Sequence, residues 1–182
     1  MLPAIYAVLM VVLIIVALQD FRERRIYWLL VPSAFLLFFL SSVKTVGIAE
    51  GIKFSLYNAL FFILQLILIF LYYLIKHREL TNIINRYLGL GDVLFVLAIC
   101  PAFSPANFIL FYLAGLILAL ATFFVLGLIQ RDKNKEIPLA GVLSIALLFL
   151  LSYRFINKEF NLYNDEQSLI ALFHWTDLNT YR

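Results

Sequence analysis

Six long apolar runs constrain this chain more than any other feature of its sequence. Each is close to the roughly 17–25 residues with which a helix crosses about 30 Å of hydrocarbon. Inside a bilayer only helices and closed barrels satisfy their own backbone hydrogen bonds, and these runs lack the alternation of barrel strands. We therefore expect an all-α fold, a polytopic membrane protein built as a bundle of about six transmembrane helices. The runs are Leu2–Gln19, Tyr27–Val43, Phe54–Ile75, Leu88–Phe103, Asn107–Ile129 and Pro138–Tyr153.

The composition agrees with a chain whose solvent is the lipid bilayer. Apolar residues make up 64% of the 182 and charged residues 14%, against roughly 45–50% and about 25% in soluble domains. The net charge of +3 is too small to indicate a nucleic-acid partner. One cysteine, Cys100, excludes an internal disulfide and a cysteine-based zinc site. His77 and His174 are expected on opposite sides of the membrane, so we expect no metal and no cofactor.

Two parts of unequal character make up the chain. We expect a membrane core over residues 1–153 and a polar C-terminal tail over residues 154–182. The apolar stretch Leu169–Trp175 inside the tail is too short to span a bilayer. The first run is expected to be a membrane helix and not a cleaved signal peptide, because no basic residue precedes it and no small-residue cleavage site follows it.

Lysine and arginine are distributed unevenly between the two sides of the predicted bundle. Nine of the 14 lie in residues 20–26, 76–87 and 130–137, which share one side, and five lie on the other. Because loops rich in lysine and arginine stay in the cytoplasm, we expect these three loops inside and the N-terminus outside.

Two aspartates are expected near the cytoplasmic face of the bundle. Asp20 follows the first run, and Asp92 lies in the segment Leu88-Gly89-Leu90-Gly91-Asp92 at the start of the fourth. From the rise of a helix, Asp92 should lie about 10 Å below the membrane surface. Two carboxyls in a site of low dielectric share one proton, so one can act as general base while the other acts as general acid. The pair therefore indicates peptide hydrolysis without a metal.

Less specific interpretations exist for each residue alone. An aspartate at a helix end is usually an interfacial cap, and a bare Gly-x-Gly is common where membrane helices pack. Asp92 has apolar sequence on both sides, and a carboxylate at that depth usually has a function. A hypothesis of another class is a non-catalytic membrane assembly subunit or an ion-coupled transporter, in which both aspartates bind a cation or carry protons.

Three segments of the chain resemble the type IV prepilin peptidases, membrane aspartic proteases of the GxGD group. Residues 20–26 read Asp-Phe-Arg-Glu-Arg-Arg-Ile, which is similar to the family's first motif. Residues 89–92 read Gly-Leu-Gly-Asp, its second motif, and residues 136–141 read Glu-Ile-Pro-Leu-Ala-Gly, where the family often has Ile-Pro-Phe-Gly-Pro. The resemblance covers about residues 1–153. The chain resembles the short form, which lacks the cysteine-containing insertion and the methyltransferase activity.

The resemblance implies a site and a substrate. Asp20 and Asp92 would be the catalytic pair of a peptidase in the bacterial inner membrane, active at its cytoplasmic face. The substrate would be a pilin-like or pseudopilin precursor with a basic leader before a hydrophobic helix. Residues expected to bind substrate or shape the site are Gly89, Gly91, Arg24, Arg25 and Pro138.

The sequence departs from the family pattern at Tyr27-Trp28, where Pro-Asn is common, and at Leu94, where lysine is frequent. These departures bear on substrate identity more than on reaction type. Gly-Leu-Gly-Asp also occurs in presenilin-like intramembrane proteases, which remain an alternative. Those proteases carry their aspartates on consecutive helices, whereas two predicted helices separate Asp20 from Asp92 here.

The uneven distribution of basic residues gives a testable orientation. Single cysteines placed at Glu79 and Asn134, in a Cys100→Ser background, should react with an impermeant thiol reagent only from the cytoplasmic side, and one placed at Glu50 only from outside. Labelling of intact cells against inverted membrane vesicles measures this. The opposite pattern would put both aspartates on the wrong side for a leader held in the cytoplasm.

Overall fold

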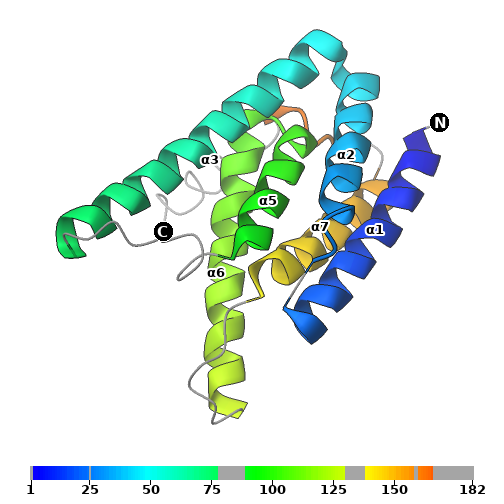
Figure 1. Cartoon of the computed structure of the whole chain (residues 1–182). Coiled ribbons are helices and arrows are strands. Elements are labelled where there is room, and N and C mark those ends of the chain that lie inside the picture. Colours follow the sequence, from blue (N-terminus) through cyan, green and yellow to red (C-terminus); the bar gives the residue numbers. More distant parts are fainter. Residues whose placement is uncertain (1, 25, 78–88, 130–137, 158–159, 166–182) are drawn as a thin grey trace, which may run out of the picture.

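Every regular element among the described residues is helical. The computed structural model describes residues 2–24, 26–77, 89–129, 138–157 and 160–165. The predicted all-helical membrane bundle is confirmed (Figure 1). Its elements are α1 (Leu2–Glu23), α2 (Leu30–Val46), α3 (Ile48–His77), α5 (Leu90–Ile99), the short 3-10 helix η1 (Cys100–Ala102), α6 (Pro105–Ile129) and α7 (Leu139–Ile156).

Four of these helices, α1, α3, α6 and α7, are long and apolar enough to cross a membrane, so the chain is a multi-pass membrane protein. The other two apolar helical segments are shorter, namely α2 and the continuous stretch from Leu90 to Ala102 formed by α5 and η1. The bundle therefore combines full-length helices with two that are short for a bilayer about 30 Å thick.

Two of the helix starts, those of α2 and α3, differ from the starts of the expected apolar runs by three residues or more. Tyr27 is apolar but belongs to a turn, in which its carbonyl accepts a hydrogen bond from the Leu30 N–H at 2.9 Å, so α2 begins three residues later than expected. In contrast, α3 begins at Ile48, six residues before the run at Phe54. Glu50 and Lys53 form an ion pair of 2.8 Å one turn apart, which lets the helix continue through its polar start.

Gly47 makes the sharp connection between α2 and α3 possible. It is the single residue between the two helices, and its φ of 90° lies in a region that side chains of L-amino acids disfavour. Its N–H donates to the Val43 carbonyl at 3.1 Å and closes the end of α2. A glycine is therefore required here by the backbone itself.

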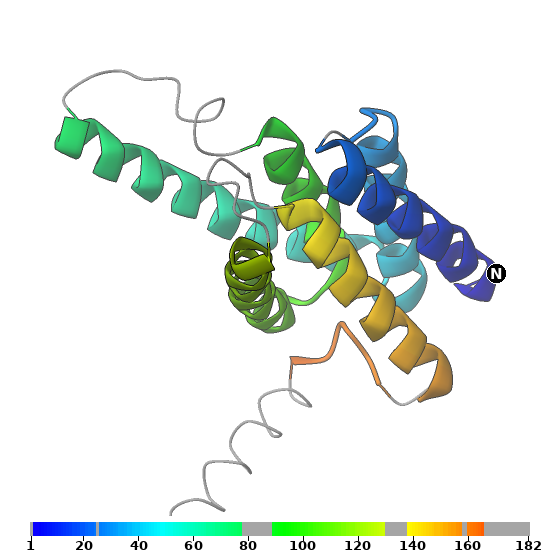
Figure 2. The ribbon, with the colours of Figure 1, turned by 90° about the horizontal axis from the view of Figure 1, so that it is seen from below.

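The core of the bundle lies where α1, α2, α5 and α7 meet. α1 runs beside α7 and also packs on α2, which in turn contacts α3 and α5 (Figures 1 and 2). Fully buried side chains such as Leu13 of α1, Phe95 of α5 and Leu147 of α7 fill this space. α3 is different, because its C-terminal half extends away from the other helices in both views and only 11% of its apolar window is buried. Such a surface suits contact with lipid.

The segment from Phe160 to Asp165 packs back onto the bundle beside the start of α6. Leu162 and Tyr163 are buried, and the Leu162 carbonyl accepts hydrogen bonds from the Ser104 N–H at 3.1 Å and from Asn107 Nδ2 at 3.0 Å. This part of the predicted polar tail is thus attached to the helices. The boundary between core and tail at residue 153 stays a prediction.

Asn58 provides a test of how the short helical stretch is held. Its buried Nδ2 donates to the carbonyls of Cys100 and Phe103, at 2.8 and 2.9 Å, and so ties α3 to η1. Asn58→Ala should lower the free energy of unfolding by about 1–2 kcal/mol, because two buried carbonyls lose their donor. Thermal unfolding in detergent micelles measures this. Ser55→Ala, which removes only a hydrogen bond to the Gly51 carbonyl within α3, is the control, and equal midpoints for the two variants would contradict the assignment.

Candidate active site

Two aspartates that are distant in sequence meet at the N-terminus of α7. The Gly141 N–H donates to Asp20 Oδ2 at 2.6 Å, and the Ala140 N–H donates to Asp92 Oδ1 at 2.9 Å. Asp20 comes from the last turn of α1 and Asp92 from the first turn of α5. Because Cα atoms of consecutive residues are about 3.8 Å apart, two carboxyls bound to consecutive amides lie beside each other.

The start of α7 can hold two carboxylates for reasons common to all helices. The first amides of a helix have no partner within it, and the helix dipole places partial positive charge at this end. Pro138 precedes the helix, contributes no side-chain cap, and its carbonyl accepts the Val142 N–H at 3.0 Å. Asp20 and Asp92 therefore cap α7 from two other helices.

Asp20 is enclosed by protein, with a relative exposure of 6%. Four residues later, Arg24 ends α1 in the left-handed conformation, with φ 55°, and its N–H donates to the Asp20 carbonyl at 3.2 Å. The Arg24 guanidinium is close enough to attract the Asp20 carboxylate electrostatically, but the two form no ion pair within 4 Å. Buried Nη1 of Arg24 has no hydrogen-bond partner among the described residues. Arg24 thus lies at the candidate site, whereas Arg25 is outside the described residues.

Asp92 is half-buried, and in the sequence it follows the two glycines of its motif. Gly89 is extended and precedes α5, and a Cβ added there would lie 3.0 Å from Asp92 Oδ2, which is tighter than most real contacts. Gly91 lies inside α5, and a Cβ there would meet only Ile26 at 3.6 Å, an ordinary contact. The space beside the Asp92 carboxyl therefore excludes a larger residue at position 89 more strictly than at position 91.

The amides of Ala140 and Gly141 were not among the predicted site residues. The resemblance to the family over residues 136–141 singled out Pro138 in the same segment. A backbone N–H has no signature in the sequence, and this resemblance was the only signal that could have indicated these amides.

Of the other groups that the sequence offered, Cys100 lies apart from the two aspartates. Cys100 is buried at the far end of α5, where its thiol contacts the Val96 carbonyl at 3.4 Å. His77 is the last residue of α3, and His174 lies outside the described residues. Within the described part of the chain, no group of three or more histidine, cysteine, aspartate or glutamate side chains could hold a metal ion.

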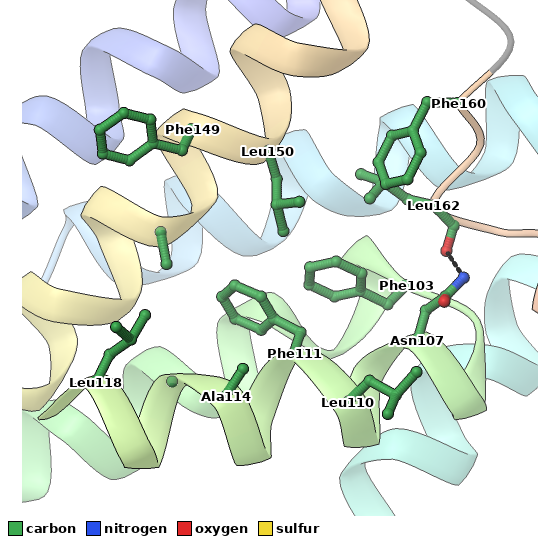
Figure 3. A pocket seen from close by; sticks show the side chains of 12 residues that line it. Phe103, Asn107, Leu110, Phe111, Ala114, Leu118, Phe149, Leu150, Phe160 and Leu162 are labelled. Carbon is green, nitrogen blue, oxygen red and sulfur yellow. Dashed lines mark hydrogen bonds between the residues drawn. The ribbon is translucent and has the colours of Figure 1, made fainter. Parts of the chain in front are cut away.

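A cavity of about 450 Å³ lies between α6 and α7, and it does not include either aspartate (Figure 3). Phe111 of α6, Leu150 of α7 and Leu162 of the returning segment are among its walls. Asn107 is its polar residue, and this side chain donates to the Leu162 carbonyl in the close view. The cavity is therefore an apolar space separate from the candidate site.

The fold and the paired carboxyls define a class: a multi-pass helical membrane protein with a candidate two-aspartate site. The family model described as the type IV leader peptidase family matches residues 7–124. That match covers more than half of the chain and includes both Asp20 and Asp92, so the chain belongs to the type IV leader peptidase family and is related to peptidases. Neither the curated proteins nor the solved structures contain a significant match.

The pairing of two carboxyls, with Cys100 at the far end of α5, predicts that peptidase activity needs neither a metal nor a thiol. Chelators should leave cleavage unchanged, and Cys100→Ser should retain activity within about twofold, because a buried thiol without a basic neighbour is a poor nucleophile. Cleavage of a precursor by purified protein, with and without EDTA or a thiol reagent, measures this. Inhibition by EDTA that added zinc reverses would indicate a metalloprotease.

Proposed function

We propose that the protein is a membrane-embedded aspartic endopeptidase that removes the leader of type IV prepilin-like precursors at the cytoplasmic membrane face. Asp20 and Asp92 are the catalytic pair. The observation that carries the proposal is the placement of both carboxyls on consecutive amides of α7, at 2.6 and 2.9 Å. Membership of the type IV leader peptidase family supports the same reaction.

Peptide hydrolysis by this pair requires one ionised and one protonated carboxyl. The ionised carboxylate takes a proton from water as the water oxygen attacks the scissile carbonyl carbon. The protonated carboxyl hydrogen-bonds the carbonyl oxygen and gives it its proton as the attack proceeds, so that a neutral tetrahedral diol results. A proton then passes to the amide nitrogen, the C–N bond breaks, and an acid and an amine leave. The coupled pair titrates as a unit, so no separate role is assigned to either aspartate.

The neighbouring residues shape the space in which the substrate backbone lies. Extended Gly89 leaves room beside Asp92, and its main chain can pair with an extended peptide by hydrogen bonds, whereas Gly91 already belongs to α5. Pro138 fixes the start of α7 and so the direction of its amides. Arg24 places positive charge near Asp20, where it can attract oxygen atoms of the substrate. Arg25 adds a second positive charge to the same segment of the sequence.

The place of the pair in the bundle supports this substrate class. Asp20 and Asp92 belong to helix ends, which agrees with a cut where a hydrophobic helix meets its polar leader. A precursor with a basic leader and a hydrophobic helix presents such a junction. The protein belongs in a bacterial inner membrane, with its N-terminus outside and the aspartates toward the cytoplasm.

Removal of either carboxyl tests this function. Asp20→Asn and Asp92→Asn should each lower the rate of precursor cleavage by at least about 100-fold, because a single carboxyl cannot serve as both base and acid. The measurement is incubation of the purified variants with pilin-like precursors from the same genome, with products identified by mass. Glu50→Gln, which removes an exposed carboxyl on α3, is the matched control and should cleave normally.

The products also separate this function from its alternatives. Normal processing by either asparagine variant would exclude the catalytic pair and favour an assembly subunit or a transporter. A cut inside the hydrophobic helix, instead of at its junction with the leader, would indicate a presenilin-like intramembrane protease.

A further inference from the structure

We infer that Gly141 is a positioning residue, whose missing side chain lets Asp20 reach the α7 amide and hold its place beside Asp92. This inference rests on the proposed function, since it concerns how the same two carboxyls are aligned. It starts from the space around Gly141. A Cβ added there would lie 2.8 and 2.9 Å from two ring atoms of Phe21 and 3.0 Å from Asp20 Oδ2.

Backbone conformation does not explain a glycine at this place. Gly141 is the third residue of α7, and among the described glycines only Gly47 has a positive φ. Inside a helix, glycine is less favourable than alanine because its backbone loses more freedom on folding. The gain must therefore come from the space that a methyl group would fill.

The oxygen that meets this methyl group is the one that accepts the Gly141 N–H. Asp20 Oδ2 is 2.6 Å from the Gly141 nitrogen, so a move away from a Cβ of the same residue lengthens or bends that hydrogen bond. Phe21 is different, because its side chain is 40% exposed and its ring can turn aside. Alanine at residue 141 thus acts mainly on the carboxyl and less on the packing of Phe21.

Loss of this contact would affect alignment of the pair and not substrate affinity. Asp92 would keep its hydrogen bond from the Ala140 N–H at 2.9 Å, while the Asp20 carboxyl would move away from the residue 141 amide. A Cβ at 3.0 Å requires Asp20 Oδ2 to move by a few tenths of an ångström, and a displacement of about 1 Å in a reacting group can cost roughly 100-fold in rate. We expect Gly141→Ala to lower kcat by about tenfold with KM within about twofold of wild type.

Two further variants separate positioning from general disturbance of α7. In Phe21→Leu/Gly141→Ala the ring contact is relieved but the contact with Asp20 Oδ2 remains, so kcat should stay low relative to Phe21→Leu alone. Gly115→Ala is the matched control, because its Cβ would collide with Leu143 of α7, away from both carboxyls. It should lower the thermal midpoint and keep kcat within about threefold of wild type. Full rescue by Phe21→Leu, or an equal loss of kcat in Gly115→Ala, would overturn the inference.

A measurement that needs no substrate tests the contact directly. The chain has seven glycines, so protein with isotopically labelled glycine in micelles gives a short set of amide resonances, and the one missing from Gly141→Ala belongs to Gly141. A charge-assisted hydrogen bond moves this proton downfield. Asp20→Asn should therefore shift it upfield by more than any glycine signal outside the two aspartate motifs.

The two measurements fail in different ways. An unmoved Gly141 resonance in Asp20→Asn overturns the positioning role whatever the activity. Cleavage by wild type and by Gly141→Ala with equal kcat also overturns it and leaves the proposed function standing. Cleavage that survives Asp20→Asn overturns the proposed function itself.

Discussion

Two hydrogen bonds from consecutive amides of α7 join three helices at one point. Asp20 of α1 and Asp92 of α5 each accept one of them. A buried carboxylate is costly without donors, and the first amides of a helix are costly without acceptors, so each group satisfies the need of the other. The positive end of the helix dipole adds to the attraction. Alignment of the candidate site and capping of α7 are therefore the same interaction.

The helical architecture could be predicted from the sequence, and the two aspartates could be chosen as candidates, because both have local signatures. Apolar runs of membrane length imply helices, and an aspartate after Gly-Leu-Gly within such a run is conspicuous. Helix ends were less predictable. Hydropathy alone placed Tyr27 inside a helix, where hydrogen bonding forms a turn, and it left out the polar first turns of α3 that the Glu50–Lys53 pair supports.

The contacts that build the site could not be predicted, because they join distant residues through the backbone. The Asp92–Ala140 contact spans 48 residues and the Asp20–Gly141 contact spans 121. Nothing in the local sequence shows that an amide will face a carboxyl of another helix. The burial of Tyr163 could not be predicted either, because it lies in a polar stretch of sequence. Ser104 and Asn107 hold this stretch at the start of α6 by donating hydrogen bonds to the Leu162 carbonyl.

The order of the helices along the chain has a consequence for biogenesis. α1 and α5 precede α7 in the chain, so a chain whose α7 has not yet joined the bundle holds Asp20 and Asp92 without the amides that receive them. Isolated carboxyls at a membrane interface become protonated or remain hydrated. When α7 joins the bundle, its Ala140 and Gly141 amides bind the two carboxyls side by side. A chain that ends before α7 would therefore lack the two amides that hold both carboxyls at one place.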